Sequence, residues 1–297
     1  MKLTIAIPTY NRAKRLEKAL FDLCHEIISA TNKLDVSVFV SNNGSMDDTE
    51  AVIMRYRKLF IESGIPFTSI FAESNQGFDA NIIACYTGSN SEYVWFLSDD
   101  DNIIAGAVDA ILDDIKKHHP SVIYYNHDQK PYDKAQLYIK ESEYFDQIAD
   151  KNIIALQKII NWPKLTALVI RKSENDLLMP TQDLGFAHVS LALQCGLTVG
   201  GVLHSPTFTA YPDDDYKEHI DFVPYIGNNL NKVIRWALQA NNKMFLYDLL
   251  AIPDIDPFIS SLNTLGAYYR GKHTLSLPIK QELWKTVHHK IGSGWLK

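Results

Sequence analysis

The chain has 297 residues, of which 46% are hydrophobic and 22% are charged, and its formal net charge at pH 7 is −6. This length and composition are typical of a globular protein with a substantial core and exclude a largely disordered chain. The net negative charge argues against a dedicated nucleic-acid-binding protein, which needs a basic face to replace the counterions of the phosphates.

Short apolar runs alternate with segments of helical period through residues 1–125. Strands are expected at residues 2–8, 35–42, 66–74, 92–98 and 121–127, with helices around 16–27, 45–60, 79–88 and 104–115 between them. Ser45 and Asp48 have the spacing of a capping box for the second helix. This alternation predicts an α/β fold with a mostly parallel sheet and helices on both of its faces.

The pattern changes after residue 125. A strand at 162–172, a helix at 186–196 and a strand pair with a glycine bend at 198–211 are expected, and the chain from residue 216 is expected to be helical. The last stretch from Arg270 onward carries five lysines against a single glutamate. Two interpretations stay open for it: a solvated helix face, or a peripheral contact with an anionic membrane surface.

The cysteine pattern and the N-terminal residues bear on localisation. Cys24, Cys85 and Cys195 stand far apart among apolar residues, as buried thiols of a reducing compartment do. The N-terminal residues lack the long apolar run of a secretory signal, and no segment reaches the ~18 uninterrupted apolar residues of a membrane span. We therefore expect a cytoplasmic protein, either free or peripheral at the inner face of the membrane.

Polar segments follow each of the first four expected strands. They read TYNR, SNNGSMDD, ESNQGFDAN and SDDDN, in chain order. Ligands of open parallel sheets bind at the carboxyl ends of the strands, because the crossover loops and helix N-termini gather there. We therefore expect these four segments to form one rim.

Three adjacent carboxylates, Asp99, Asp100 and Asp101, close the fourth expected strand. Their mutual repulsion falls when a divalent cation lies among them, and Mg²⁺ or Mn²⁺ commonly binds one or two protein carboxylates together with substrate phosphates. The pattern therefore indicates a metal site completed by a diphosphate. The alternative is an acidic first turn, favoured by the dipole of a helix starting near Ile103.

The segments AIPTYNR, VSNNGSMDDT, SNQGFDAN and WFLSDDD resemble, in this order, the family 2 glycosyltransferases of the GT-A fold. The resemblance covers the first 125 residues or so, and its style is similar to that of bacterial surface-polysaccharide transferases, including the abequosyltransferase-like ones. It implies a Rossmann-like nucleotide-sugar-binding half at 1–125, an acceptor-binding half of the same domain at 126–215, and a helical C-terminal region at 216–297.

The resemblance also implies roles for individual residues. Asn42 and Asn43 stand where the family usually has an acidic residue followed by Asp or Asn contacting the base, so this sequence departs from the commoner pattern. The DXD pattern of the family maps onto Asp99 and Asp101, which would bind Mn²⁺ or Mg²⁺. The residues expected to bind the nucleotide sugar are Pro8, Thr9, Tyr10, Arg12, Asn42, Asn43, Asn75, Gly77, Asp99 and Asp100.

The resemblance leaves two candidates for the general base. Family members similar to this chain place an acidic pair at the start of a helix in the second half, where this sequence has Ala187 and His188. His188 is therefore one candidate base, since an imidazole titrates near pH ~6.5. Asp183, five residues upstream, is the other.

The resemblance implies an inverting, metal-dependent transferase that moves a sugar from a nucleoside-diphosphate sugar to a hydroxyl of a glycan or lipid-linked oligosaccharide. A nucleotidyltransferase is disfavoured, because PTYNRAKR lacks the glycines of a phosphate loop. A non-catalytic nucleotide- or carbohydrate-binding protein that retains the fold stays open as an alternative, because the expected acidic pair is missing.

Overall fold

The computed structural model describes residues 2–126, 136–138, 164–172, 185–198 and 201–212. The chain divides into two compact units, residues 1–218 and 219–297, and every described residue belongs to the first unit. The expected helical region at 216–297, its basic end and its membrane contact therefore lie outside the described residues, as does Asp183.

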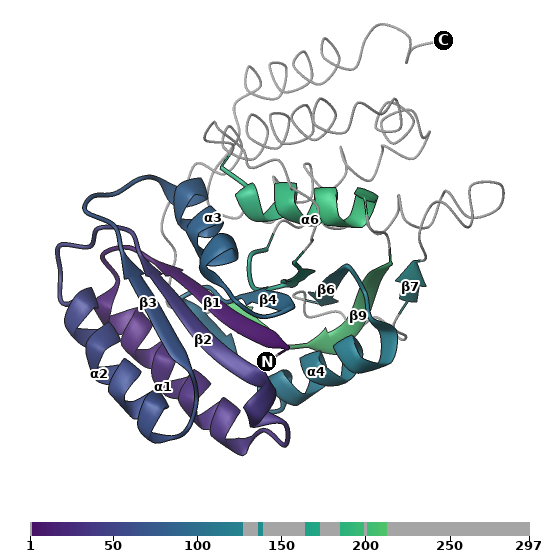
Figure 1. The fold of residues 1–297 in the computed structure, drawn as a ribbon, viewed down its shortest axis with the longest axis horizontal. Coiled ribbons are helices and arrows are strands. Elements are labelled where there is room, and N and C mark those ends of the chain that lie inside the picture. The colour runs from purple at the N-terminus through teal and green to yellow at the C-terminus, as the bar shows by residue number, and fades with distance from the viewer. Residues whose placement is uncertain (1, 127–135, 139–163, 173–184, 199–200, 213–297) are drawn as a thin grey trace, which may run out of the picture. The chain divides into compact units, whose positions relative to one another are not determined.

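The first unit is built on an eight-stranded sheet with the strand order β3-β2-β1-β4-β8-β6-β9-β7 (Figure 1). Strands β3, β2, β1 and β4 are mutually parallel, and β8 is antiparallel to both β4 and β6. The strands of this sheet are β1 (Leu3–Thr9), β2 (Val36–Asn42), β3 (Phe67–Phe71), β4 (Tyr93–Phe96), β6 (Val122–Asn126), β7 (Gln136–Tyr138), β8 (Leu168–Arg171) and β9 (Val202–Phe208).

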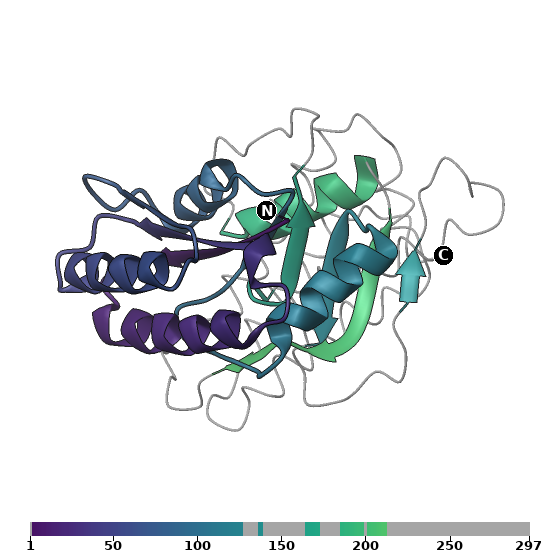
Figure 2. The same ribbon diagram turned by 60° about the horizontal axis from the view of Figure 1, so that its bottom comes forward.

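Helices cover both faces of the sheet, so the unit has three layers. Helices α1, α2 and α4 lie on one face, and α3 and α6 lie together on the other (Figures 1 and 2). The helices are α1 (Ala13–Ser29), α2 (Thr49–Glu62), α3 (Phe78–Gly88), α4 (Ala107–His118) and α6 (Ala187–Thr198), with a short 3-10 helix at Lys33–Asp35. The mostly parallel α/β sheet with helices on both faces agrees with the sequence prediction.

Burial against helices on both faces explains why the central strands β1 and β4 are mostly apolar. All seven residues of β1 and all four of β4 are buried, because helices pack on both faces of a parallel sheet. The buried polar side-chain atoms of β4 are hydrogen-bonded. Trp95 Nε1 donates to the carbonyl of Thr166 at 2.8 Å, and the Tyr93 hydroxyl donates to the carbonyl of Pro120 at 2.9 Å. The strand ends are therefore held on a rigid platform.

The segment after β4 differs from the prediction. A helix was expected to start near Ile103, but residues Asp101–Ile103 form strand β5, which pairs antiparallel with β10 (Ala210–Pro212), and α4 begins only at Ala107. The pairing partner lies more than 100 residues away, so no local pattern could indicate it. The expected strand pair at 198–211 also differs from the prediction. The break between its two strands, β9 and β10, lies at Thr209 and not at the glycines, and the two strands belong to different sheets.

The predicted capping box is wrong. Helix α2 begins at Thr49, and its N-cap residue Asp48 makes no side-chain capping bond. Asp47 accepts the backbone N–H of Thr49 at 3.1 Å instead, while the Ser45 hydroxyl accepts the backbone N–H of Asn11 from the loop after β1. Ser45, which the local pattern assigned to the helix cap, therefore bonds to another loop instead.

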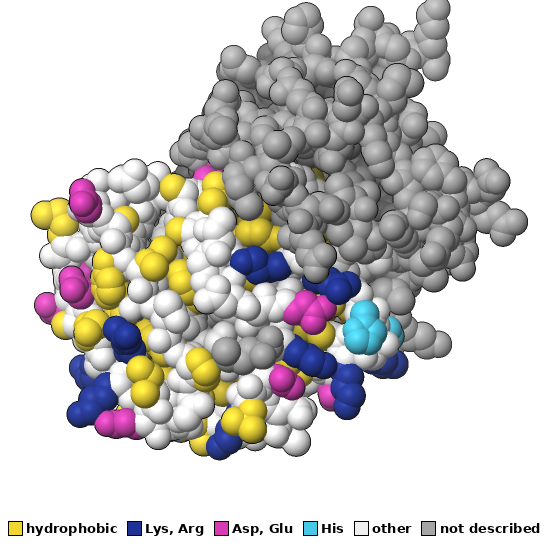
Figure 3. Space-filling model, viewed as in Figure 1, with side chains coloured by type: hydrophobic (Ala, Val, Ile, Leu, Met, Phe, Trp, Pro, Cys, Tyr) yellow, Lys and Arg dark blue, Asp and Glu magenta, His cyan; other side chains and the backbone are white. Residues whose placement is uncertain are grey.

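The surface of the unit is mixed. On the face shown in Figure 3, hydrophobic side chains lie in small separate groups, and side chains of both charges are interspersed over the part of the chain that the structure describes. Within the described ranges, no helix is both long enough and apolar enough to cross a bilayer.

We predict that Gly88→Ala destabilises the protein through a single contact. An added Cβ at Gly88, the last residue of α3, would approach the buried ring of Phe39 in β2, with Cε2 only 2.6 Å away. Overpacking of this kind costs about 1–3 kcal/mol, which urea denaturation measures. The cost should shrink in a Phe39→Leu background, and an unchanged midpoint for Gly88→Ala alone would contradict the packing.

Candidate functional site

The carboxyl ends of the first strands meet at one edge of the sheet. Thr9, the last residue of β1, is in register with Asn42, the last of β2, which in turn is in register with Phe71, the last of β3. Leu97 continues β4 along β1, since its N–H donates to the carbonyl of Ala6 at 3.0 Å. The four polar segments predicted to form a rim therefore start from neighbouring strand ends.

The loop after β1 is joined to the loop after β2 by two reciprocal hydrogen bonds. The backbone N–H of Asn11 donates to the Ser45 hydroxyl at 2.8 Å, and the backbone N–H of Met46 donates to Asn11 Oδ1 at 2.7 Å. Asn11 has φ of 51°, a left-handed conformation that asparagine tolerates better than most residues. Asn11 was not among the predicted site residues, although an asparagine between a strand and a helix signals such a turn.

Pro8, Thr9 and Tyr10, which were predicted to bind the nucleotide sugar, differ in their exposure. Pro8 and Thr9 are buried within β1, and the Thr9 hydroxyl donates to Asp99 Oδ2 at 2.7 Å. Tyr10 follows them at the rim with 38% of its surface exposed. Of these three residues, Tyr10 is the one whose side chain is available to pack against a planar ligand.

The two asparagines at the end of β2, Asn42 and Asn43, are buried and bind neighbouring backbone groups. Asn42 Oδ1 accepts the backbone N–H of Ser45 at 3.0 Å. Asn43 reaches the loop after β3, where its Nδ2 donates to Asn75 Oδ1 at 2.9 Å and to the carbonyl of Gly77 at 3.0 Å. Gly77 has φ of 91°, so the predicted glycine is required there by backbone conformation.

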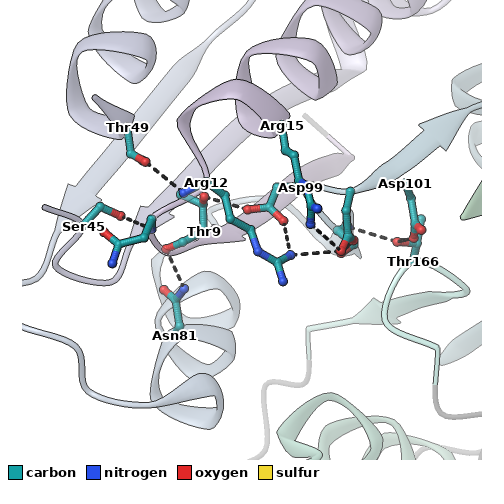
Figure 4. Close-up of polar contacts among 12 residues, drawn as sticks. Thr9, Arg12, Arg15, Ser45, Thr49, Asn81, Asp99, Asp101 and Thr166 are labelled. Carbon is teal, nitrogen blue, oxygen red and sulfur yellow. Dashed lines mark hydrogen bonds and ion pairs between the residues drawn. The ribbon is translucent and has the colours of Figure 1, made fainter. Parts of the chain in front are cut away.

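Asp99 is the most buried carboxylate of the acidic strand end, at 3% exposure. Its Oδ1 accepts from Arg12 Nη1 at 2.8 Å, and its Oδ2 accepts from the Thr9 hydroxyl (Figure 4). Burial raises the pKa of the Asp99 carboxyl to about 6, although the Arg12 guanidinium and the Thr9 hydroxyl both act to lower it. Both oxygens of this carboxylate therefore bind donors of the protein itself.

The next two carboxylates have different partners. Asp100 Oδ2 accepts from Arg12 Nη1 at 3.0 Å and lies 3.8 Å from Arg15 Nη1, while its Oδ1 accepts from the Ser98 hydroxyl. Asp101 Oδ2 accepts from the hydroxyl of Thr166, which comes from the segment before β8 (Figure 4). Arg15 and Thr166 were not predicted, because their proximity depends on the way that α1 and β8 pack.

This set of groups fits a divalent cation that is coordinated partly by the protein and partly by a substrate. Arg12 pairs with Asp99 and Asp100, Arg15 lies near Asp100, and the three adjacent carboxylates offer the oxygen donors that Mn²⁺ and Mg²⁺ prefer. Across the described ranges, no group of three or more His, Cys, Asp or Glu side chains could enclose a metal ion on its own.

Helix α6 lies beside α3 on one face of the sheet and carries a second set of candidate residues (Figure 1). Asp79, in the first turn of α3, is 4% exposed and accepts the backbone N–H groups of Gly185 at 2.7 Å and Ala187 at 2.9 Å, where α6 begins. His188 is 2% exposed, and its ring lies 5.9 Å from the ring of Phe78 and 5.8 Å from that of Phe186. The predicted candidate base is therefore packed between aromatic rings, on a helix that Asp79 anchors.

Comparison with protein families and curated sequences gives several matches. The family model described as Glycosyl transferase family 2 matches residues 4–174, more than half of the chain. Abequosyltransferase RfbV of Salmonella typhimurium is 22% identical over 253 residues, covering 76% of this chain and 74% of that protein. The GalNAc(5)-diNAcBac-PP-undecaprenol beta-1,3-glucosyltransferase of Campylobacter jejuni is 30% identical over 113 residues, which span 37% of this chain and only 33% of that relative.

Solved structures show the fold. S. aureus TarS 1-349 has a TM-score of 0.64 at 17% identity, covering 98% of this chain and 82% of that one. Mannosyltransferase PcManGT from Pyrobaculum calidifontis, in complex with GDP-Man and Mn²⁺, has a TM-score of 0.57 at 15% identity, covering 99% of this chain and 81% of that one. The predicted GT-A-type fold is thereby confirmed.

We predict that Arg12→Gln destabilises the protein in a pH-dependent way. Without the guanidinium, the pKa of buried Asp99 rises further above its unfolded value of about 3.9. The folded state then binds more protons than the unfolded state, so its stability falls as the pH rises through that window. We expect a loss of about 2–3 kcal/mol at pH 8 that becomes much smaller at pH 5, where the protonated carboxyl needs no counter-charge.

Urea denaturation at both pH values, with EDTA present to remove divalent cations, measures this difference. Arg15→Gln is the matched control, because Arg15 lies 3.8 Å from the more exposed Asp100 and its loss should cost less than about 1 kcal/mol. An equal loss for Arg12→Gln at pH 5 and pH 8 would show that the guanidinium does not compensate Asp99.

Proposed function

We propose that this chain, which belongs to glycosyl transferase family 2, transfers a sugar from a nucleoside-diphosphate sugar to a hydroxyl of a glycan or lipid-linked oligosaccharide in bacterial cell-surface polysaccharide synthesis. One arrangement carries this function: three carboxylates at the end of β4 lie beside the interlocked loops that follow β1, β2 and β3. Such a rim at the carboxyl ends of parallel strands suits a nucleotide and its diphosphate.

Names of similar proteins support the substrate classes. The Campylobacter relative is named a glucosyltransferase of GalNAc(5)-diNAcBac-PP-undecaprenol, which is a lipid-linked glycan, and the Salmonella relative is named an abequosyltransferase. TarS 1-349 also has a structure in complex with UDP-GlcNAc, with a TM-score of 0.61 at 17% identity. We therefore propose a nucleotide-sugar donor and a glycan or lipid-linked acceptor for this chain.

Asp101 is the residue that we assign to a divalent cation, Mn²⁺ or Mg²⁺. Asp99, the other predicted ligand, is 3% exposed, and each of its oxygens already accepts from Thr9 or Arg12, so it is less accessible to a metal than Asp101. A cation bound at Asp101 would stabilise the negative charge that gathers on the diphosphate as the glycosidic bond breaks. The complex of PcManGT with GDP-Man and Mn²⁺ supports a cation in a site of this fold.

The acceptor hydroxyl requires a general base within hydrogen-bond reach on the face of the anomeric carbon opposite the diphosphate. Attack from that face inverts the anomeric configuration. His188 in the first turn of α6 and Asp183 just before it are the two candidates, and the contacts of Asp79 with Gly185 and Ala187 fix where this helix begins. We propose an inverting reaction in which one of these residues takes the proton.

A non-catalytic nucleotide- or carbohydrate-binding protein is the second candidate function. The burial of His188 between the rings of Phe78 and Phe186 favours it, because a ring that is 2% exposed does not present a nitrogen to an acceptor hydroxyl without movement. The two functions share the donor site and differ only in turnover of the donor.

We expect nucleoside diphosphates to stabilise the protein only together with Mn²⁺. Thermal shift with UDP, GDP, CDP and dTDP, each with and without Mn²⁺, should give a higher Tm for at least one nucleotide with metal present, since a ligand at 100 times its Kd adds about 2.7 kcal/mol. Asp101→Asn should lose this gain, whereas Asp113→Asn on the exposed face of α4 should keep it. The donor-site proposal fails if no nucleotide raises the Tm of the wild-type protein.

We expect the variant that lacks the general base to turn over its donor about 10²–10⁴-fold more slowly while still binding nucleotide. Thermal shift first identifies the nucleotide that binds. Turnover of the corresponding sugar nucleotide, by hydrolysis or transfer, is then compared between His188→Gln and Asp183→Asn, and the slower variant identifies the base. Wild-type turnover in both variants would exclude both residues. No turnover by the wild-type protein with any binding donor would favour the non-catalytic function.

A further inference from the structure

Asn43 occupies the position at which the resemblance predicts contact with the nucleobase, but its side chain is committed elsewhere. It is 5% exposed, and its amide faces the loop of residues 74–77, which follows β3. Its Nδ2 donates to Asn75 Oδ1 at 2.9 Å and to the carbonyl of Gly77 at 3.0 Å, and its Oδ1 accepts the backbone N–H of Gln76 at 2.9 Å. One amide thus binds three consecutive residues of that loop.

Both donor hydrogens of the Asn43 amide are used in these contacts, since a primary amide has only two. To donate to a nucleobase, the amide would have to leave Asn75 Oδ1 and the Gly77 carbonyl, which would then keep only the N–H groups of Gly77 and Asn81. Asn75 adds to the order of the same loop, because its Oδ1 also accepts the backbone N–H of Gly77 at 2.9 Å.

Gly44 brings the same two loops into direct backbone contact. It has φ of 71°, and an added Cβ would lie 2.6 Å from Cα of Ser74 and 2.9 Å from the backbone nitrogen of Asn75. The loop after β2 and the loop of residues 74–77 are therefore pressed together beside the Asn43 amide. This close approach is independent of the hydrogen bonds and places the amide within reach of three residues at once.

We propose that Asn43 is a positioning residue that orders the 74–77 loop of the donor site and does not select the nucleobase. An aspartate at this position would keep one acceptor for the Gln76 N–H but would turn an oxygen toward Asn75 Oδ1 and the Gly77 carbonyl, where acceptor faces acceptor. The amide, and not the carboxylate, is therefore the group that this chain requires. The consequence for ligand binding rests on the proposed function, because the ligand is the diphosphate of a nucleotide-sugar donor.

Asn43→Asp tests this role by comparing nucleotides with one another. Calorimetric Kd values for UDP, GDP, CDP and dTDP with Mn²⁺ should all weaken by a similar factor of about ten for those that bind the wild-type protein, so their ratios stay unchanged. Asn90→Asp, an exposed residue before β4, carries the same charge change and should leave every Kd unchanged. A change of tenfold or more in the ratio between two nucleotides would show that residue 43 reads the base and would overturn the proposal.

Amide hydrogen exchange tests the loop contact without any ligand. In the nucleotide-free protein, Asn43→Asp and Asn75→Ala should each speed exchange at Gln76 and Gly77 by at least tenfold, while the core strand β1 keeps wild-type protection. Unchanged exchange at these two amides would overturn the positioning role. Failure of the wild-type protein to bind any nucleotide would refute the proposed function, but the exchange rates would still decide whether Asn43 orders the loop.

A double variant tests whether Asn43 acts on the ligand through Asn75 or independently of it. If Asn43 acts through Asn75, then Asn43→Ala and Asn75→Ala remove one shared interaction. The nucleotide Kd of the double variant should then exceed that of the weaker-binding single variant by no more than about threefold. Fully additive losses would mean that the two residues act on the ligand separately, against the proposal.

Discussion

The neutralisation of a buried carboxylate is the interaction on which the whole rim depends. Asp99 lies at 3% exposure at the end of β4, and its charge is tolerated because Thr9 and Arg12 each donate to one of its oxygens. Arg12 comes from the loop between β1 and α1, and Thr9 is the last residue of β1. The acidic strand end and the start of α1 are therefore one electrostatic unit.

Pre-organisation extends from this unit along the rim. Asn11 joins the loop after β1 to the loop after β2, and Asn43 joins the latter to the loop after β3. The carbonyl of Thr9 accepts both the backbone N–H of Asn43 at 3.0 Å and Asn81 Nδ2 at 3.3 Å, which ties α3 to the same strand end. Because these loops are already bonded to one another, binding of a nucleotide-sugar donor would cost little conformational entropy of the loops.

The sequence predicted the alternating strands and helices of residues 1–125 because their apolar periods are local. It also predicted which segments lie at the rim, since parallel strands align their carboxyl ends. Partners that come from distant parts of the chain could not be predicted: Thr166 on Asp101, Asp79 at the start of α6, and β10 beside β5. The direction of the Asn43 amide could not be predicted either, because turn chemistry and base contact favour the same residue type and its partners Asn75, Gln76 and Gly77 lie in another loop.

A crystal structure of the protein with Mn²⁺ and a stabilising nucleoside diphosphate tests the central claim most directly. Anomalous scattering from manganese should locate the ion at the carboxylate of Asp101, with diphosphate oxygens among its ligands and with Asp99 still bound to Thr9 and Arg12. Manganese and nucleotide bound away from the end of β4, with Asp101 still accepting from Thr166, would contradict the account.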